Sequence, residues 1–197
     1  IQLKLNKFIQ LRPLACVLLA ASLVGCASSK STRMTADDFD QMAAAMAQSL
    51  QQAPAIVDRT PQSPLWLVSV AKVENLTSDV MTESEQWKIM DDLIGSLPMQ
   101  TLWDDKHIRF VLPPEKVLLL RGESPSGDKR QELANFGAER DVTHVLNAVF
   151  RSTTRAKSAG RTDLYYAEFS LLDLQTGRVI WTDKFEYKRS ASGKIWD

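Results

Sequence analysis

Cysteine is scarce in this chain of 197 residues, and its two positions limit how the fold is stabilised. Cys16 lies inside an apolar N-terminal stretch, and Cys26 follows that stretch directly. If the stretch is removed during export and Cys26 is modified, the rest of the chain keeps neither a free thiol nor a disulfide. Its stability must then come from the packing of a hydrophobic core.

Histidine and glycine are also scarce, which argues against the common kinds of catalytic site. The two histidines, His107 and His144, fall in predicted strands, and neither has the spacing of a metal ligand to another histidine, a cysteine or a pair of acids. The sequence contains neither a glycine-rich phosphate loop nor a G-x-S-x-G motif. We therefore expect no catalytic residue, no metal, no cofactor and no small-molecule substrate.

One short motif suggests an enzyme of another kind. The segment from Ser126 to Lys129 matches S-x-x-K, the nucleophile motif of penicillin-recognising enzymes. The partner motifs of those enzymes, S-D-N and K-T-G, do not occur in the sequence. A flexible turn before a helix is the favoured interpretation, and an enzyme that uses Ser126 is the weaker hypothesis.

Three pairs of adjacent aspartates, at residues 37–38, 91–92 and 104–105, have two interpretations. One is that they supply carboxylates to a metal ion. The favoured one is that the first pair lies at a helix N-terminus, where the helix dipole stabilises negative charge, and that the other two pairs are solvated.

An excess of charge of one sign is absent, since the chain has 24 basic and 24 acidic residues. Without the N-terminal Lys4, Lys7 and Arg12, 21 basic residues stand against 24 acidic ones, a net charge of about −3. This balance argues against an overall polyanion-binding surface, and we expect no nucleic-acid partner. A local basic stretch surrounds a predicted hairpin end and comprises Arg151, Arg155, Lys157 and Arg161. A solvated loop is its favoured interpretation, and contact with lipid head groups or an anionic glycan is the alternative.

Long apolar runs are rare, and the N-terminal one has the form of an export signal. Residues 14–24 are apolar apart from Ser22, but they are too few to span a bilayer, which requires ~20 residues. Basic residues precede the run, and it ends in Leu-Val-Gly-Cys at Cys26, the lipobox pattern of bacterial lipoproteins. We predict that residues 1–25 are a signal peptide and that Cys26 carries a lipid anchor on the periplasmic side of the outer membrane. A buried cysteine in a hydrophobic helix is the alternative.

The rest of the chain is predicted to form a short tether and one globular domain. Residues 26–34 are small and polar and are assigned to the tether, and residues 35–197 are assigned to the domain. The domain is expected to begin with a helix and a proline-containing linker, residues 35–64, before an α/β core at residues 65–189. An extended tether of about eight residues reaches roughly 28 Å.

The first helix of the domain is predicted from its cap and its periodicity. Thr35 is a suitable N-cap, and apolar side chains follow it at helical spacing: Phe39, Met42, Met46 and Leu50. We interpret this face as docked on the core, with a partner-binding helix as the alternative.

Alternating and β-branched segments predict the strands of the core. They lie at residues 66–73, 107–112, 144–153, 164–174 and 178–188. A tight turn at residues 175–177 joins the last two strands into a hairpin.

Helices are predicted between these strands. One starts at a capping box formed by Thr82 and Glu85, one runs from Pro114 to Gly122, and one covers residues 128–136. The predicted fold class is α/β (α+β): a mixed, largely antiparallel sheet with helices packed on one face, ending in a long β-hairpin.

Three segments of the core carry a resemblance to a known family. They are residues 68–77 (VSVAKVENLT), residues 136–146 (FGAERDVTHVL) and residues 165–183 (YYAEFSLLDLQTGRVIWTD). Together with the lipobox they resemble the penicillin-binding-protein activator lipoproteins of the LpoB type, and the likeness extends over residues 34–189. The resemblance implies a fold like the N-terminal domain of the protein TolB, no catalysis, an outer-membrane location, and binding and stimulation of a bifunctional peptidoglycan synthase.

Two functional hypotheses follow from the residues and the resemblance together. The leading one is a lipid-anchored, non-enzymatic regulator whose partner is a penicillin-binding protein. The alternative is an oligomeric, structural component of an outer-membrane assembly or secretion system. Candidate contact regions are the exposed ridge of the hairpin, with Tyr166 and Glu168, and the loop at residues 74–79, and no single contact residue is assigned.

Overall fold

The computed structural model describes residues 31–122, 141–157 and 160–192. The helices in these ranges are α1 (Ala36–Gln52), α2 (Pro54–Val57), α3 (Glu83–Gly95), α4 (Met99–Asp104) and α5 (Pro114–Leu120). The strands are β1 (Trp66–Val70), β2 (Glu74–Leu76), β3 (Ile108–Val111), β4 (His144–Lys157), β5 (Gly160–Asp173) and β6 (Val179–Ser192).

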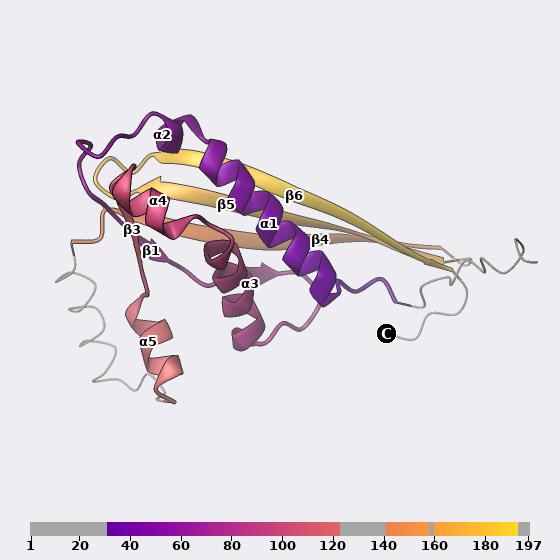
Figure 1. The fold of residues 1–197 in the computed structure, drawn as a ribbon. Coiled ribbons are helices and arrows are strands. Elements are labelled where there is room, and N and C mark those ends of the chain that lie inside the picture. Colours follow the sequence, from indigo (N-terminus) through magenta and orange to yellow (C-terminus); the bar gives the residue numbers. More distant parts are fainter. Residues whose placement is uncertain (1–30, 123–140, 158–159, 193–197) are drawn as a thin grey trace, which may run out of the picture.

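The strands form one mixed sheet in the order β3-β1-β4-β5-β6, with β2 paired to β4 (Figure 1). The pairs β1–β3, β1–β4 and β2–β4 are parallel, whereas β4, β5 and β6 are mutually antiparallel. Those last three strands have 14 residues each and extend well beyond the rest of the sheet. The predicted fold class is therefore confirmed.

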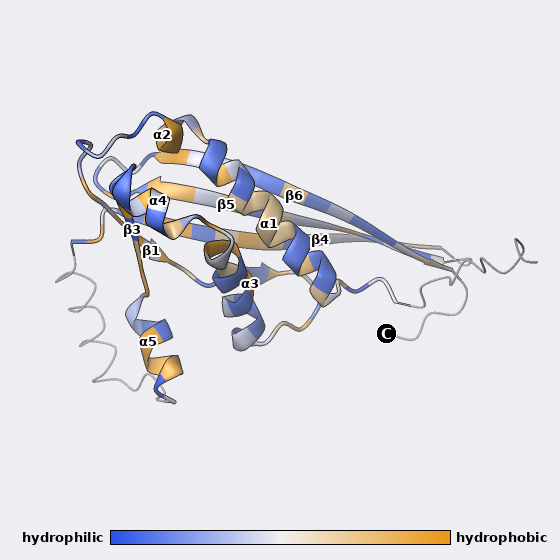
Figure 2. Cartoon of the chain, in the orientation of Figure 1, coloured by the Kyte–Doolittle hydropathy of each residue, from blue (hydrophilic) through white to orange (hydrophobic). Residues whose placement is uncertain are grey.

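Helices α1 and α3 lie over one face of the sheet and form the core with it (Figure 1). Met42, Met46 and Leu50 of α1 are buried, so the predicted docking of this helix is confirmed. Alternate residues of β5, including Phe169 and Leu171, point into the same core. Apolar and polar residues alternate along the strands and the helices, as Figure 2 shows, because each element buries only one side.

Capping interactions define where α1 and α3 begin. The backbone N–H of Thr35 donates to Asp38 Oδ2 at 2.7 Å, and the backbone N–H of Thr82 donates to Glu85 Oε2 at 2.7 Å. The backbone N–H of Glu85 donates in turn to the Thr82 hydroxyl at 3.2 Å. Both predicted helix starts are confirmed, because these side chains satisfy amide groups that the first turn leaves unpaired.

The proline-containing part of residues 35–64, which was predicted as a linker and runs from residue 51, contains the short helix α2 and is held to the sheet by Arg59. This side chain is buried, lies 3.9 Å over the ring of Trp66, and donates to the carbonyl oxygen of Lys106 at 2.9 Å and to that of Pro64. Pro54 occupies the first turn of α2, where the missing N–H costs nothing. Prolines in this segment therefore mark a helix start as well as loops.

Other departures from the predicted elements are small. The predicted loop at residues 74–79 begins with the strand β2, and α4 was not predicted. His107 lies just before β3 with a positive φ of 55° rather than inside a strand. The predicted helix at residues 128–136 and the S-x-x-K segment lie outside the described residues.

Candidate interaction surface

The loop after β2 is held in one shape by its own side chains. Asn75 Oδ1 accepts from the backbone N–H of Thr77 at 3.0 Å and from the Thr77 hydroxyl at 2.7 Å. The amide of Asn75 donates to the carbonyl oxygen of Asp79 at 2.8 Å, and the backbone N–H of Asp79 donates to the Thr77 hydroxyl at 3.2 Å. The loop is therefore pre-organised, because asparagine and threonine side chains bond the backbone of their own turn.

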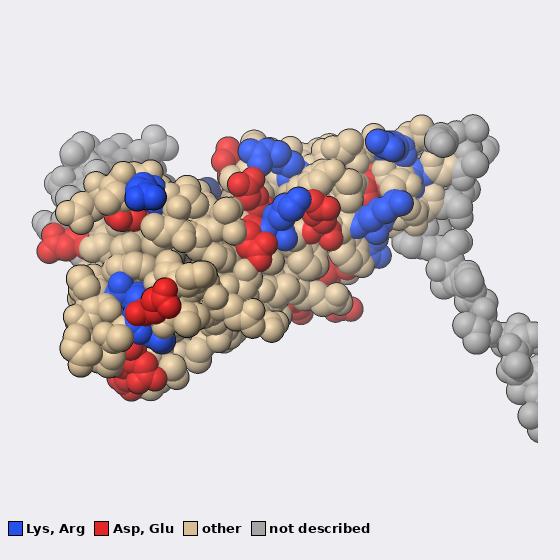
Figure 3. Space-filling view, turned by 90° about the horizontal axis from the view of Figure 1, so that it is seen from above, with Lys and Arg blue, Asp and Glu red and all other residues tan. Residues whose placement is uncertain are grey.

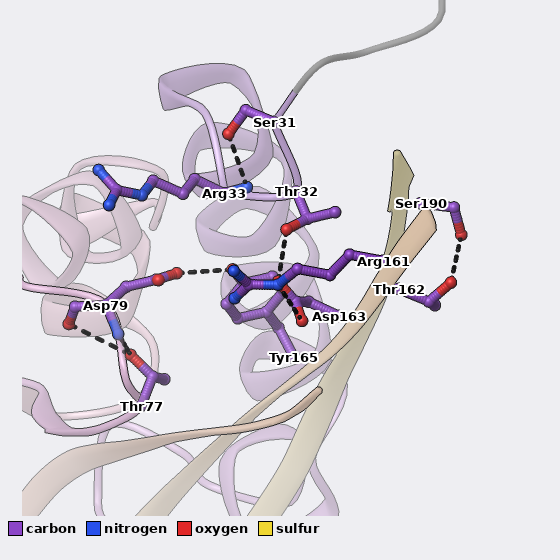
Figure 4. Close-up of polar contacts among 10 residues, drawn as sticks. All are labelled: Ser31, Thr32, Arg33, Thr77, Asp79, Arg161, Thr162, Asp163, Tyr165 and Ser190. Atoms are coloured by element: carbon purple, nitrogen blue, oxygen red, sulfur yellow. Dashed lines mark hydrogen bonds and ion pairs between the residues drawn. The ribbon is translucent and has the colours of Figure 1, made fainter. Parts of the chain in front are cut away.

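Tyr165 of β5 attaches this loop to the sheet. Its hydroxyl donates to Asp79 Oδ2 at 2.6 Å across 86 positions of sequence (Figure 4). Burial of the phenol, together with the hydrogen bond to the Asp79 carboxylate, raises the pKa of Tyr165 above its ordinary value. The phenol therefore stays protonated and keeps donating at every physiological pH.

Two exposed apolar side chains and a cavity lie at this loop. Val80 is 96% exposed and Leu76 is 52% exposed, so both apolar side chains are accessible to a partner. A cavity of about 200 Å³ is lined by Val80, and its walls also include Phe39, Phe150 and Tyr165. A projecting apolar residue beside a partly aromatic hollow is an arrangement that suits a protein partner.

The N-terminal segment of the described chain packs near the same place. Thr32 is completely buried, and its hydroxyl donates to Asp163 Oδ2 at 2.5 Å (Figure 4). Arg161 Nε lies 2.9 Å from the same carboxylate. Burial opposes ionisation of Asp163, but hydrogen bonds from Thr32, Thr154 and Arg161 outweigh it and hold the pKa of Asp163 below its ordinary value.

A second ionic contact joins the start of α1 to β6. The Arg189 guanidinium lies 2.5 Å from Asp38 Oδ2 and 3.2 Å from the Thr35 hydroxyl. Burial opposes ionisation of Asp38, but hydrogen bonds from Thr35, Tyr187 and Arg189 hold its pKa below the ordinary value. Asp38 thus serves both the helix cap, as predicted for the first aspartate pair, and a tertiary contact.

Tyr166 and Glu168, the other predicted contact residues, point away from α1 and α3. Adjacent residues of a strand face opposite sides of the sheet, so Tyr165 faces the helices and Tyr166 faces the uncovered side. Glu168 is exposed there and lies 3.7 Å from Arg151, while Lys184 pairs with Glu186 at 2.7 Å. The two predicted contact regions therefore lie on opposite faces of the sheet.

The histidines have structural surroundings. His144 is buried, its ring centroid lies 4.1 Å from that of Trp66, and its Nδ1 is 2.7 Å from the Thr143 hydroxyl. Burial, reinforced by the nearby charge of Arg59 and opposed by that of Asp173, lowers the pKa of His144. His107 Nδ1 is 2.8 Å from the carbonyl oxygen of Ser63.

The remaining aspartate pairs form ion pairs and hydrogen bonds with neighbouring side chains. Asp91 pairs with Lys116 at 2.8 Å, and Asp92 with Lys88 at 2.5 Å. Asp104 accepts a hydrogen bond from Gln100 at 2.7 Å. Within residues 31–122, 141–157 and 160–192, no group of histidine, cysteine or acidic residues is arranged to hold a metal ion, and no helix is long and apolar enough to cross a membrane.

Sequence reasoning missed the contacts of Thr32 with Asp163 and of Tyr165 with Asp79, although one signal for the first was present. Asp163 has the same parity along β5 as the buried Tyr165 and Phe169, so the alternation already placed a carboxylate on the covered face. A buried carboxylate requires partners. Cys26 and Ser126 lie outside the described residues.

One comparison with known proteins identifies a family, and another finds structures that are distantly similar. A family model described as peptidoglycan-synthase activator LpoB matches residues 38–187. The LpoB C-terminal domain from Salmonella enterica is 14% identical with a TM-score of 0.45, over 76% of this chain and 98% of that one. The corresponding Escherichia coli domain is 15% identical with a TM-score of 0.42, over 76% and 98%. Lipoprotein GNA1162 from Neisseria meningitidis is 14% identical with a TM-score of 0.38, over 64% and 83%. No curated protein matches the chain.

Proposed function

Because the chain belongs to the LpoB family of peptidoglycan-synthase activators, we propose that it is an outer-membrane lipoprotein, acylated at Cys26, that binds and stimulates a bifunctional peptidoglycan synthase. The observation that carries the proposal is the family match, which spans residues 38–187 and so includes all but the first two residues of α1 and nearly the whole sheet. The protein itself performs no catalysis in this proposal.

The loop formed by residues 75–80 is the contact region that we favour. Its internal hydrogen bonds and the Tyr165–Asp79 bond fix the loop before binding, so little conformational entropy is lost when a partner docks. Val80 provides an apolar anchor that water surrounds in the free protein. Burial of such a side chain at the centre of an interface contributes more to affinity than the charged rim around it.

In this proposal, the activator stimulates the synthase by shifting it from an inactive to an active conformation. A binding protein accelerates an enzyme when it has higher affinity for the active conformation than for the inactive one. The activator therefore needs a rigid contact surface and no reactive group, which matches the pre-organised loop.

The test is the rate of glycan polymerisation and crosslinking by each purified bifunctional synthase of the source organism, with and without the lipidated protein. We expect stimulation of one synthase, and loss of about tenfold or more in affinity for it in the variant Val80→Asp. Val57→Asp is the matched control, because Val57 is also exposed but lies on α2, away from the loop. The proposal fails if every synthase stays unbound and unchanged in rate.

Three further measurements separate the parts of the proposal. Metabolic labelling with palmitate, compared between the natural chain and Cys26→Ala, tests the anchor, and membrane fractionation tests the outer-membrane location. Light scattering tests the alternative of an oligomeric assembly component, which a stable ring would favour.

A further inference from the structure

The described chain begins at one end of the long strands. Residues 153–156, 161–164 and 188–191 form this end, here called the strand tip, where Arg155 pairs with Thr162 and Thr162 pairs with Ser190. Figure 4 shows Ser31, Thr32 and Arg33 beside Arg161 and Asp163 of the tip. The buried Thr32 hydroxyl fixes this position through its hydrogen bond to Asp163.

The distance from Cys26 to the tip is short in comparison with the molecule. Thr32 lies six positions after Cys26, a span of roughly 21 Å when the chain is fully extended. Each of the strands β4, β5 and β6 has 14 residues and spans about 48 Å at ~3.4 Å per residue. A lipid on Cys26 therefore keeps the strand tip near the bilayer, whereas the β5–β6 turn at Gly177 lies at the far end.

The charges exposed at the tip are basic. The strand tip contains Arg155, Arg161, Lys188 and Arg189 and a single acid, Asp163. Asp163 is buried and paired with Arg161, whereas Arg155 and Lys188 are exposed on the uncovered face of the sheet. Figure 3 shows several basic groups near the end where the long strands terminate, with acidic groups between and beside them.

We propose that the strand tip docks on the anionic head groups of the membrane that holds the lipid anchor, with Arg155 and Lys188 as the principal contacts. This inference rests on the proposed acylation of Cys26. Each basic residue near an anionic surface strengthens its binding about fivefold, and the anchor removes most of the entropic cost of bringing the tip there. The docked tip fixes which way the domain points, so that the long strands extend away from the bilayer.

The test measures energy transfer from a dye on the lipidated protein to an acceptor lipid in vesicles. The acylated chain has no free cysteine if its leader is removed, so a single introduced cysteine gives specific labelling. Ser190→Cys places the dye at the tip, and Gln175→Cys places it at the β5–β6 turn. Vesicles of phosphatidylethanolamine and phosphatidylglycerol are compared with vesicles of phosphatidylcholine alone.

We expect clearly stronger transfer from position 190 in the anionic vesicles than in the neutral ones, where the tether alone holds the tip, and weak transfer from position 175 in both. Salt at 0.5 M should reduce the tip signal, because it screens charges beyond a few ångströms. The double variant Arg155→Gln/Lys188→Gln should reduce the ratio of docked to undocked tips about 30-fold. The matched control, Arg121→Gln/Arg178→Gln, removes the same charge from exposed residues elsewhere and should leave the signal unchanged.

Several outcomes would overturn the proposal. One is a tip signal that is equal in neutral and anionic vesicles, which would mean that the tether alone places the tip. Another is an equal loss of energy transfer in the two double variants. A third is binding of the protein to purified peptidoglycan that depends on Arg155 and Lys188, together with energy transfer that does not respond to lipid charge. Failure of the acylation itself is distinguishable, because the protein would then not float with vesicles of any composition. A protein that docks but stimulates no synthase would overturn the proposed function and leave this inference intact.

Discussion

At the scale of single residues, His144 links pH to stability. Burial lowers its pKa, so the unfolded chain binds a proton on this side chain more readily than the folded one. Its contribution to stability is therefore complete above about pH 6.5, the ordinary value for histidine, and is lost as the pH falls through the lowered pKa. We expect the urea midpoint to decrease between pH 7.5 and pH 5.5, and to decrease less in His144→Gln. His107→Gln is the control and should retain the full decrease.

Tyr165 tests whether the loop after β2 depends on its attachment to the sheet. Tyr165→Phe removes the only donor that β5 gives Asp79 within the described residues, and we expect a loss of about 1–2 kcal/mol in the free energy of unfolding. The same variant should weaken synthase binding, because the loop would no longer be fixed. Tyr166→Phe, on the opposite face, should change stability by less than about 0.5 kcal/mol. Equal effects of the two substitutions would show that the hydrogen bond is unimportant.

At the scale of elements, the capping box of α3 is the clearest local sequence feature that determines where a helix begins. Thr82→Ala removes the hydroxyl that accepts from the backbone of Glu85, and should reduce the free energy of unfolding by about 1 kcal/mol. Ser84→Ala is the control. Ser84 lies two residues after Thr82 and is exposed, so its substitution should have little effect on the free energy of unfolding. Thermal or chemical denaturation of the two variants measures the difference, and a larger loss in Ser84→Ala would contradict this assignment.

The elements also show how far sequence reasoning reaches. Strand alternation in β4, β5 and β6 and the caps at Thr35 and Thr82 are local patterns, and they predicted the sheet type and most helix starts. The pairing of β2 with β4 and the Tyr165–Asp79 bond depend on residues far apart in sequence, so no local pattern encodes them. The sequence predicted β4 and β6 too short, because their C-terminal residues are mostly polar. Where a strand extends beyond the core, apolar and polar residues no longer alternate along it.

At the scale of the whole molecule, two carboxylates hold the N-terminal region to the long strands. The pKa values of Asp38 and Asp163 are both lowered, so their contribution to stability is present above about pH 4 and is lost as the pH falls through the lowered values. We expect residues 31–50 to detach below pH 4 before the sheet unfolds. Hydrogen exchange of α1 compared with β5 at pH 3 and pH 6 measures this. Asp163→Asn should bring part of that exchange to neutral pH, and simultaneous exchange of both elements under all conditions would refute the expectation.

The order of strands in the sheet also determines when the domain can fold. β1 and β3 pair with each other, but β1 and β2 reach the rest of the sheet only through β4, which begins at His144. A chain that is synthesised or translocated with its N-terminus first therefore exposes the apolar faces of α1, β1 and α3 until the last third of the sequence has emerged. The local meander β4–β5–β6 then forms quickly and supplies the surface on which the waiting elements assemble. The strand order thus predicts that folding is completed only after the C-terminal strands have formed, which leaves the chain open to chaperones and transport machinery until then.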